Sequence, residues 1–450
     1  MKKHLNIKFT VWQLLALGYM GVILVGSGLL SIPSATENGT TSYINALLTA
    51  TSATCVTGLI AYDTGTHWSL FGQLVILLLI QTGGLGFMTF VSVAAKMMGK
   101  KMGLFGNKAL MLASGGSSFA ELRTTITRIL KGTAIFEGSG MVLLSIRFIQ
   151  DFGFARGVYF ALFHSVSAFC NAGFDLMGSQ YGEYASLTHY ATDPIVSITV
   201  CLLIILGGLG FCVWSDVLDT KFKWKKFRLH TKIVLTVNIV LLVVSTVLFW
   251  VFERNTEQMQ QFSPAAQVMI AFFNATTTRT AGFGTVDFGK MSGSGYLLSI
   301  MLMFIGGSSG STAGGVKVNT FAVIFMGMFA AFSGRSDVEV GKRRISQSMV
   351  SQALAIFVSC LFLVIASTLA ICAIEPNAPF AAVLFETVSA LGTVGLSMSL
   401  TPTLSLASRI IIIVLMYAGR VGILTIGLAF AEKRSMANIR KPVDDTILIG

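Results

Sequence analysis

The stretch ATSATCVTGL at residues 50–59 leads from an apolar segment into a short polar sequence that ends in glycine. Three later stretches repeat it: SAFCNAGF at 167–174, TTTRTAGF at 276–283 and SALGTVGL at 389–396. The glycines at the end of each pattern recur at a period of roughly 110 residues, which predicts one structural unit repeated four times. We assign repeat 1 to residues 1–100, repeat 2 with a preceding cytoplasmic loop to 101–220, repeat 3 with an intramembrane loop at 306–316 to 221–335, and repeat 4 with the C-terminal tail to 336–450.

The composition is that of a membrane protein. Hydrophobic residues make up 54% of the chain, charged residues 12%, and the mean hydropathy is +0.76. An apolar helix of about 20 residues crosses the hydrocarbon layer. Eight stretches are long enough, at about 11–32, 68–95, 126–149, 193–218, 232–252, 295–331 (with an interruption), 350–374 and 405–431.

Each repeat also holds an apolar stretch too short to span, just before its polar glycine sequence; the first is YINALLTATSAT at 43–54. Irregular backbone at membrane depth is tolerated only where it is buried in protein or lines water. We therefore expect re-entrant half-helices that end at a shared cavity. The predicted fold class is an all-α membrane protein: four tandem helix–pore loop–helix repeats, with eight transmembrane helices and four re-entrant pore helices, in pseudo-fourfold arrangement around a central pore.

Most of the 32 Lys and Arg residues fall in the N-terminal segment, the loops at 96–131, 219–232 and 332–346, and the C-terminal tail. The positive-inside rule places these segments, and both termini, in the cytoplasm. The net charge of +12 is then a topology signal and a contact with anionic lipid, not a nucleic-acid footprint. The six cysteines are scattered and form neither a disulfide framework nor a metal motif.

The glycine that ends each polar stretch has a physical role. Backbone carbonyls replace the hydration shell of a dehydrated cation when successive carbonyls point to one axis. The backbone conformation that this requires is penalised by a Cβ atom, and glycine escapes the penalty. The half-helices would also direct their partly negative C-termini toward the same point, which favours cations.

A second glycine pattern follows in each repeat, beginning at Gly83, Gly207, Gly306 and Gly419. In repeat 3 it extends to GGSSGSTAGG at 306–315, where each glycine costs a helix about 1 kcal/mol relative to alanine. This span should therefore break. In repeat 4 an arginine, Arg420, replaces the second glycine, and an intramembrane arginine is a functional hypothesis by default.

With VTGL, NAGF, TAGF and TVGL at the four positions, the chain resembles the Trk/Ktr/HKT superfamily of cation transporters, and most closely the membrane subunit of bacterial Ktr potassium systems. The resemblance covers nearly the whole chain. Glycine at all four positions implies potassium transport, with sodium as a second candidate ion. The implied selectivity filter comprises Cys55, Val56, Thr57 and Gly58; Cys170, Asn171, Ala172 and Gly173; Thr280, Ala281 and Gly282; and Thr393, Val394 and Gly395, with K⁺ at the backbone carbonyls. Arg279 departs from the pattern, and we expect its side chain to turn from the axis toward Glu386.

The resemblance also implies a gate below the filter, made by Gly306, Gly307, Ser308, Ser309, Gly310, Ser311, Thr312, Ala313, Gly314 and Gly315 together with Arg420. It implies a homodimer with one pore per subunit. It further implies a cytosolic RCK-type ring that binds ATP or ADP, docks on the basic loops and regulates the pore. The alternative to a gate is a purely structural role, in which the glycines allow close helix packing and the arginine is paired inside the bundle.

Other functions fit parts of the sequence. Residues 306–310 satisfy GxSxG with Ser308, but a hydrolase needs a partner base and only His164 lies in a plausible segment. GSTAGGVK, ending at Lys317, is not followed by the Ser or Thr of a phosphate loop. A coupled secondary cation transporter with a midplane site is the stronger alternative, because broken helices also build such sites. We expect no enzyme activity, and we expect Asp63, Asp175 and Asp287 to attract cations to the pore mouth.

Overall fold

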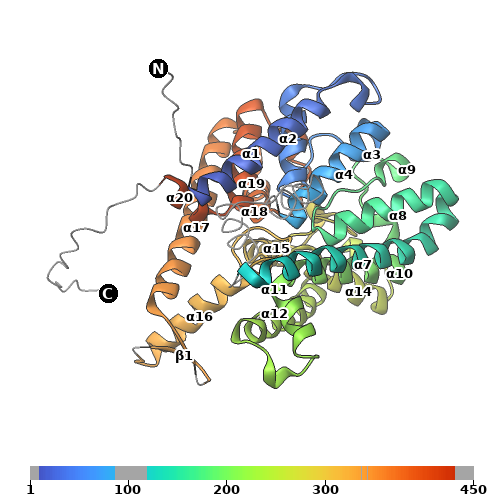
Figure 1. Cartoon of the computed structure of the whole chain (residues 1–450). Coiled ribbons are helices and arrows are strands. Elements are labelled where there is room, and N and C mark those ends of the chain that lie inside the picture. Colours follow the sequence, from blue (N-terminus) through green and yellow to red (C-terminus); the bar gives the residue numbers. More distant parts are fainter. Residues whose placement is uncertain (1–9, 87–118, 336, 342, 431–450) are drawn as a thin grey trace, which may run out of the picture.

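The computed structural model describes residues 10–86, 119–335, 337–341 and 343–430. These residues are helical apart from loops and one short hairpin (Figure 1). The longer helices are α1 (Val11–Leu30), α2 (Tyr43–Thr54), α4 (Leu70–Leu85), α7 (Phe119–Phe152), α8 (Phe154–Phe169), α10 (Pro194–Gly208), α11 (Phe211–Asp219), α12 (Leu229–Glu253), α14 (Pro264–Thr277), α15 (Gly293–Phe304), α16 (Val318–Phe332), α17 (Gln347–Ile374), α18 (Phe380–Gly392), α19 (Leu406–Val421) and α20 (Ile423–Phe430).

Several short elements connect them. The single-turn helices are α3 (Thr64–His67), α9 (Gly178–Tyr181) and α13 (Glu257–Gln260), and 3₁₀ turns lie at Pro33–Ala35, Thr188–Tyr190, Trp224–Lys226, Phe288–Lys290 and Thr401–Thr403. Strands β1 (Val338–Val340) and β2 (Arg343–Ile345) pair antiparallel in the basic loop between α16 and α17. This hairpin departs from the predicted all-α fold.

Four unbroken helices are long and apolar enough to cross a membrane within the described ranges: 12–30, 126–152, 229–253 and 347–374. The expected interruption of the sixth stretch is present, because α15 and α16 are separated by the glycine-rich loop. Two expected spans were wrong as single helices. The chain bends by 90° between α10 and α11, and by 90° between α19 and α20. Residues 87–95, the C-terminal part of the 68–95 span, lie outside the described residues.

The bends have a local cause. Gly210, between α10 and α11, has a φ of +94°, and Gly422, between α19 and α20, has a φ of +88°. This left-handed region breaks a right-handed helix and is readily adopted by glycine. The apolar composition continues across both breaks, so hydropathy alone does not reveal them.

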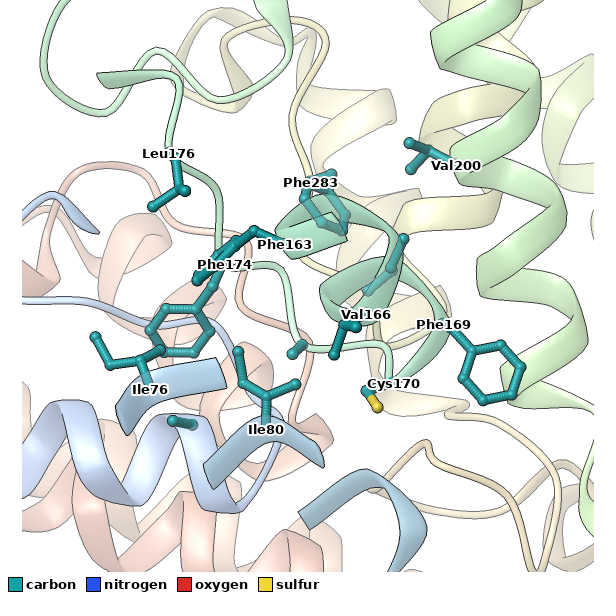
Figure 2. Packing of buried hydrophobic residues seen from close by; sticks show 14 of the residues in the cluster. Ile76, Ile80, Phe163, Val166, Phe169, Cys170, Phe174, Leu176, Val200 and Phe283 are labelled. Carbon is teal, nitrogen blue, oxygen red and sulfur yellow. The ribbon is translucent and has the colours of Figure 1, made fainter. Parts of the chain in front are cut away.

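The short helices α2, α8, α14 and α18 coincide with the four predicted half-helices. Each packs against helices of its own segment and against one helix of another segment: α8 against α4, α14 against α10, α18 against α15 and α2 against α19. The first segment therefore contacts the last, and the contacts close a circle. Figure 2 shows one of these junctions, where Ile76 and Ile80 of α4 lie beside Phe174, with Phe163 and Val166 of α8 close by.

Candidate functional site

The four glycines of the repeated pattern lie in one closed ring. Each approaches the backbone of the next segment so closely that a side chain would collide with it. A Cβ atom added to Gly58 would lie 2.6 Å from the carbonyl oxygen of Ala172, and one added to Gly173 would lie 2.6 Å from that of Ala281. A Cβ atom added to Gly282 would lie 2.6 Å from the carbonyl oxygen of Val394, and one added to Gly395 would lie 2.1 Å from that of Thr57. Four loops far apart in sequence thus meet at one point, with a carbonyl from each loop at the contact.

The loops share an unusual backbone conformation. The residue two positions before each glycine is left-handed: φ is +51° at Val56, +59° at Asn171, +71° at Thr280 and +51° at Thr393. The glycines are left-handed too, with φ of +94°, +69°, +81° and +91° at 58, 173, 282 and 395. Non-glycine residues rarely adopt this region, and such strain is often found at functional sites. Since ordinary extended backbone alternates its carbonyl directions, repeated left-handed residues turn successive carbonyls to one side.

Amides and hydroxyls behind the ring fix this orientation. The Gly58 amide donates to Ser52 Oγ at 3.0 Å, and the Gly395 amide donates to Ser389 Oγ at 3.1 Å. The Ser167 hydroxyl donates to the Phe174 carbonyl, and the Thr277 hydroxyl donates to the Phe283 carbonyl, each at 2.7 Å. Sequence reasoning missed this support. The available signal was a serine six residues before the glycine in three repeats; in repeat 3 the equivalent hydroxyl is five residues before it.

A cavity of about 500 Å³ opens on one side of the ring. All four ring glycines line it, together with the acidic side chains of Asp175, Glu183 and Asp287. Asp63 does not line it, contrary to expectation. Its carboxylate instead accepts from the amides of Gly65, Thr66 and Tyr184, so Asp63 caps α3 and ties two loops together.

The second glycine pattern lies against the ends of the short helices. A Cβ atom added to Gly83 would lie 2.0 Å from the Thr54 carbonyl oxygen. At Gly207 the corresponding distance to the Phe169 carbonyl oxygen is 1.9 Å, and at Gly419 the distance to the Leu391 carbonyl oxygen is 2.0 Å. Only glycine permits this approach. It holds the irregular backbone of the ring directly against a neighbouring helix.

The loop between α15 and α16 is hydrogen-bonded to the second glycine pattern of repeats 2 and 4. The Ser308 amide donates to the Gly208 carbonyl at 3.0 Å, the Thr312 amide to Gly207 at 3.3 Å and the Gly315 amide to Gly419 at 3.3 Å. A Cβ atom on Gly314 would lie 2.1 Å from Thr393 Oγ1. The loop therefore crosses on the side of the residues that precede the ring glycines, away from the acidic cavity.

Arg420 binds this loop to another segment. Its guanidinium donates through Nη1 to the Thr312 carbonyl and through Nη2 to the Gly83 carbonyl at the end of α4. Arg420 lies two residues before the bend at Gly422. One side chain thus joins the first, third and fourth segments beneath the ring.

Arg279 turns away from the ring, but the prediction that it faces Glu386 was wrong. Its guanidinium donates to Asn238 Oδ1 of α12, while Glu386 accepts from Ser397 and Thr401.

The structure does not support a hydrolase at Ser308. The Ser308 hydroxyl accepts from Asn238 at 3.2 Å. His164 is bonded instead to the Phe160 carbonyl and the Leu176 amide, so it supplies no base to Ser308.

Comparison with known proteins gives consistent results. A family model described as "Cation transport protein", TrkH, matches residues 22–441. The chain is 39% identical to the potassium/sodium uptake protein NtpJ of Enterococcus hirae, with 100% of this chain and 99% of that protein covered. It is also 39% identical to the Ktr system potassium uptake protein B of Bacillus subtilis, with 99% and 98% covered. The crystal structure of the potassium transporter TrkH from Vibrio parahaemolyticus shares the fold: the TM-score is 0.71 at 17% identity, with 95% of this chain and 86% of that one covered.

Proposed function

Because this chain belongs to the TrkH cation transport protein family, we propose that it takes up potassium ions across the bacterial plasma membrane through a channel-like pore. It is a multi-pass membrane transporter and not an enzyme. The observation that carries the proposal is the closed ring of Gly58, Gly173, Gly282 and Gly395. The names of two relatives, which specify potassium uptake, support the choice of ion; one of those names also includes sodium.

In this proposal the ring and the residues before it form the selectivity filter. The carbonyls of residues 55–57, 170–172, 280–281 and 393–394 would replace the water around K⁺. Removing that water in a low-dielectric medium is prohibitively costly unless oxygen ligands compensate. The left-handed residue two positions before each glycine supports this, because it turns successive carbonyls to one side.

The loop at 306–316 would act as the gate. It lies next to filter residue Thr393 and is held by hydrogen bonds to α10, α19 and Arg420, which would exchange when the pore opens. Arg420 would add a positive charge on the conduction path while the loop is closed, which repels a cation. The alternative role of Arg420, close helix packing without gating, would not require a charged residue at position 420.

The assembly proposed is a homodimer regulated by a cytosolic RCK-type ring that binds ATP or ADP. The name of the Bacillus subtilis relative, a component of a Ktr system, supports such a partner. The RCK-type ring would dock on the basic cytoplasmic loops at 96–125, 219–232 and 332–346; the second and most of the third lie within the described residues, and most of the first does not. Both termini would be cytoplasmic, with eight spans and four re-entrant helices in pseudo-fourfold order about the pore.

The circle of helix contacts favours a central pore over a coupled secondary transporter. A transporter built from inverted repeats has its site between two opposed halves. Here each short helix contacts a helix of the preceding segment, and α2 of the first contacts α19 of the last. That order surrounds one axis and marks no boundary between two halves.

The test is potassium uptake in a host that lacks its own uptake systems, comparing the wild type with Gly58→Ser. Serine at this position would collide with the Ala172 carbonyl and disturb one quarter of the ring. We expect a loss of discrimination between K⁺ and Na⁺ of about tenfold or more, since about 1.4 kcal/mol suffices for that factor. Gly138→Ala, at a glycine of α7 with open space around it, is the control. Unchanged affinity and selectivity in Gly58→Ser would refute the filter assignment.

A further inference from the structure

A second, smaller cavity lies beside the ring and has no place in the pathway described above. Its volume is about 140 Å³. Its walls come from α10, α12, the end of α14 and the glycine-rich loop, and its polar residues are Asn238, Thr276 and Arg279. The remaining lining is apolar, apart from glycine backbone, and includes Leu235 and Leu242 of α12.

Arg279 brings a positive charge to this cavity without an acidic partner. The ion pairs found among the described residues do not include it. One guanidinium nitrogen donates to Asn238, and the buried Nε has no hydrogen-bond partner in the described part of the chain. A charge held among apolar walls is normally paired, because desolvation is costly. The C-terminus of α14, just before Arg279, offsets only part of that cost.

The cavity faces the lipid side of the bundle. Asn238 lies nine residues after Leu229, the first residue of α12, which is about 13 Å along the helix axis. The neighbouring lining residue Ile239 is 58% exposed on the outside of the bundle. The cavity thus offers a cationic group at its inner end and apolar walls that reach the hydrocarbon layer.

We propose that this cavity binds the carboxylate end of a fatty acid from the membrane, with Arg279 as its counter-ion. A guanidinium pairs with a carboxylate through two parallel hydrogen bonds, and Arg279 has an unused Nε for this purpose. The volume is close to that of an apolar cavity that holds one benzene molecule. It therefore accommodates the first carbons of a single chain, and the rest of the chain lies along the exposed face of α12.

The size and depth select a single-chain acid over an anionic phospholipid. Arg279 and Asn238 lie about 13 Å inside the end of α12, so a phospholipid would have to bring its phosphate and glycerol to that depth, whereas a fatty acid brings only one small carboxylate, which Arg279 pairs. The cavity has no room for a glycerol backbone and two chains.

A fatty acid bound in this cavity would lie close to both the proposed filter and the proposed gate. Arg279 immediately precedes filter residue Thr280, and Asn238 donates to Ser308 in the proposed gate. Arg279 donates to Asn238 Oδ1 while Asn238 Nδ2 donates to Ser308, so a carboxylate that shifts the Arg279 side chain would shift Asn238 and its bond to the loop. This effect on flux rests on the proposed function; the binding itself does not, and it is measured separately.

The experiment uses a palmitate that carries a photoreactive diazirine, added to the full-length protein in liposomes. We expect light-induced labelling on residues 229–253 that is competed by unlabelled palmitate. Methyl palmitate, which lacks the charge, should compete at least about tenfold less well, because hydrogen bonds to charged groups are the strong ones. Leu235→Trp fills the cavity and should abolish this labelling. Val244→Trp, at an exposed residue of the same helix, should preserve it.

Three outcomes would overturn the proposal. The first is labelling of α12 that Leu235→Trp leaves unchanged, and the second is equal competition by the methyl ester. The third is labelling by a diazirine phosphatidylglycerol but not by the fatty acid. If labelling behaves as expected but palmitate leaves K⁺ flux unaltered in the wild type, the site stands and its link to the pore fails. Binding with no K⁺ flux under any condition would instead count against the proposed function.

Discussion

Ser389 shows how a residue outside the ring determines its geometry. Its hydroxyl accepts the Gly395 amide at 3.1 Å, its carbonyl accepts the Val394 amide at 2.8 Å, and its side chain is fully buried. With both amides turned back toward α18, the carbonyls of this loop are left to face the opposite side. Ser389 is thus a positioning residue for the proposed filter.

We therefore predict that Ser389→Ala weakens ion discrimination more than it weakens folding. The Gly395 amide would lose its acceptor in a buried place, at a cost of about 1–3 kcal/mol. K⁺ and Na⁺ uptake, measured at equal concentrations, should shift toward Na⁺ while thermal unfolding of the purified protein falls only modestly. Ser139→Ala is the control, because Ser139 is exposed and bonds only to its own helix. An unaltered K⁺/Na⁺ ratio would remove Ser389 from the filter.

At this scale the sequence revealed the glycines but not their partners. A repeated glycine is visible because its spacing recurs, and the need for a side-chain-free position follows from elementary sterics. The contact between Arg279 and Asn238 joins residues 41 apart and belongs to one repeat only. No periodicity marks such a pair, so the prediction of Glu386 as its partner failed.

At the scale of elements, the bonds of Arg420 connect the glycine-rich loop to α4 and α19. Arg420→Ala removes two charge-assisted hydrogen bonds, one to the Thr312 carbonyl of the loop and one to the Gly83 carbonyl of α4. Each such bond contributes about 1.5–3 kcal/mol. We predict that the variant conducts K⁺ without its regulatory partner, with basal flux in liposomes raised about tenfold or more. Arg420→Lys should be intermediate, because one ammonium group does not span both carbonyls.

Arg409→Ala is the matched control for this measurement. Arg409 lies on the same helix and donates to Asn45 and to the Pro402 carbonyl, far from the loop. It should leave basal flux unchanged. Equal flux in the Arg409 and Arg420 variants would show that the arginine in the gate only stabilises the helix.

The sequence predicted where the apolar helices lie, but it predicted only some of the places where they break. The loop at 306–316 carries enough glycines for its break to be read from helix propensity. A single glycine costs a helix only about 1 kcal/mol, so the bends at Gly210 and Gly422 were not evident. They depend on partners distant in sequence: the Phe211 amide, which begins α11, donates to the Gly310 carbonyl of the loop.

At the scale of the whole molecule, the order of the segments around the ring could not be predicted from the sequence. The repeat predicts that four equivalent loops meet, yet any of several circular orders would satisfy it. The contacts of α2 with α19, and of α8 with α4, select the order in which each segment follows its predecessor. The positions of the repeat boundaries stay a prediction, because no observation bears on where one unit ends.

The acidic cavity outside the ring leads to a prediction about external pH. Asp175 lies in the loop after Gly173, outside the membrane-spanning helices, and its carboxyl lines the cavity. Burial, followed by the nearby charge of Asp63, raises the pKa of Asp175 to about 7. Its negative charge is therefore present above this pH and lost as the external pH falls through it, since a raised carboxyl pKa favours the neutral form.

We expect K⁺ uptake at limiting K⁺ to decrease several-fold between external pH of about 8 and about 6, because a neutral Asp175 no longer concentrates cations in the cavity. Asp175→Asn should have low uptake at the higher pH and a flat profile. Glu183→Gln, which removes another carboxylate from the same cavity, should lower uptake but keep the pH response. Initial rates of Rb⁺ uptake at several external pH values and fixed internal pH measure both. If Asp175→Asn retained the profile of the wild type, a different group would be responsible and the cavity would attract cations without Asp175.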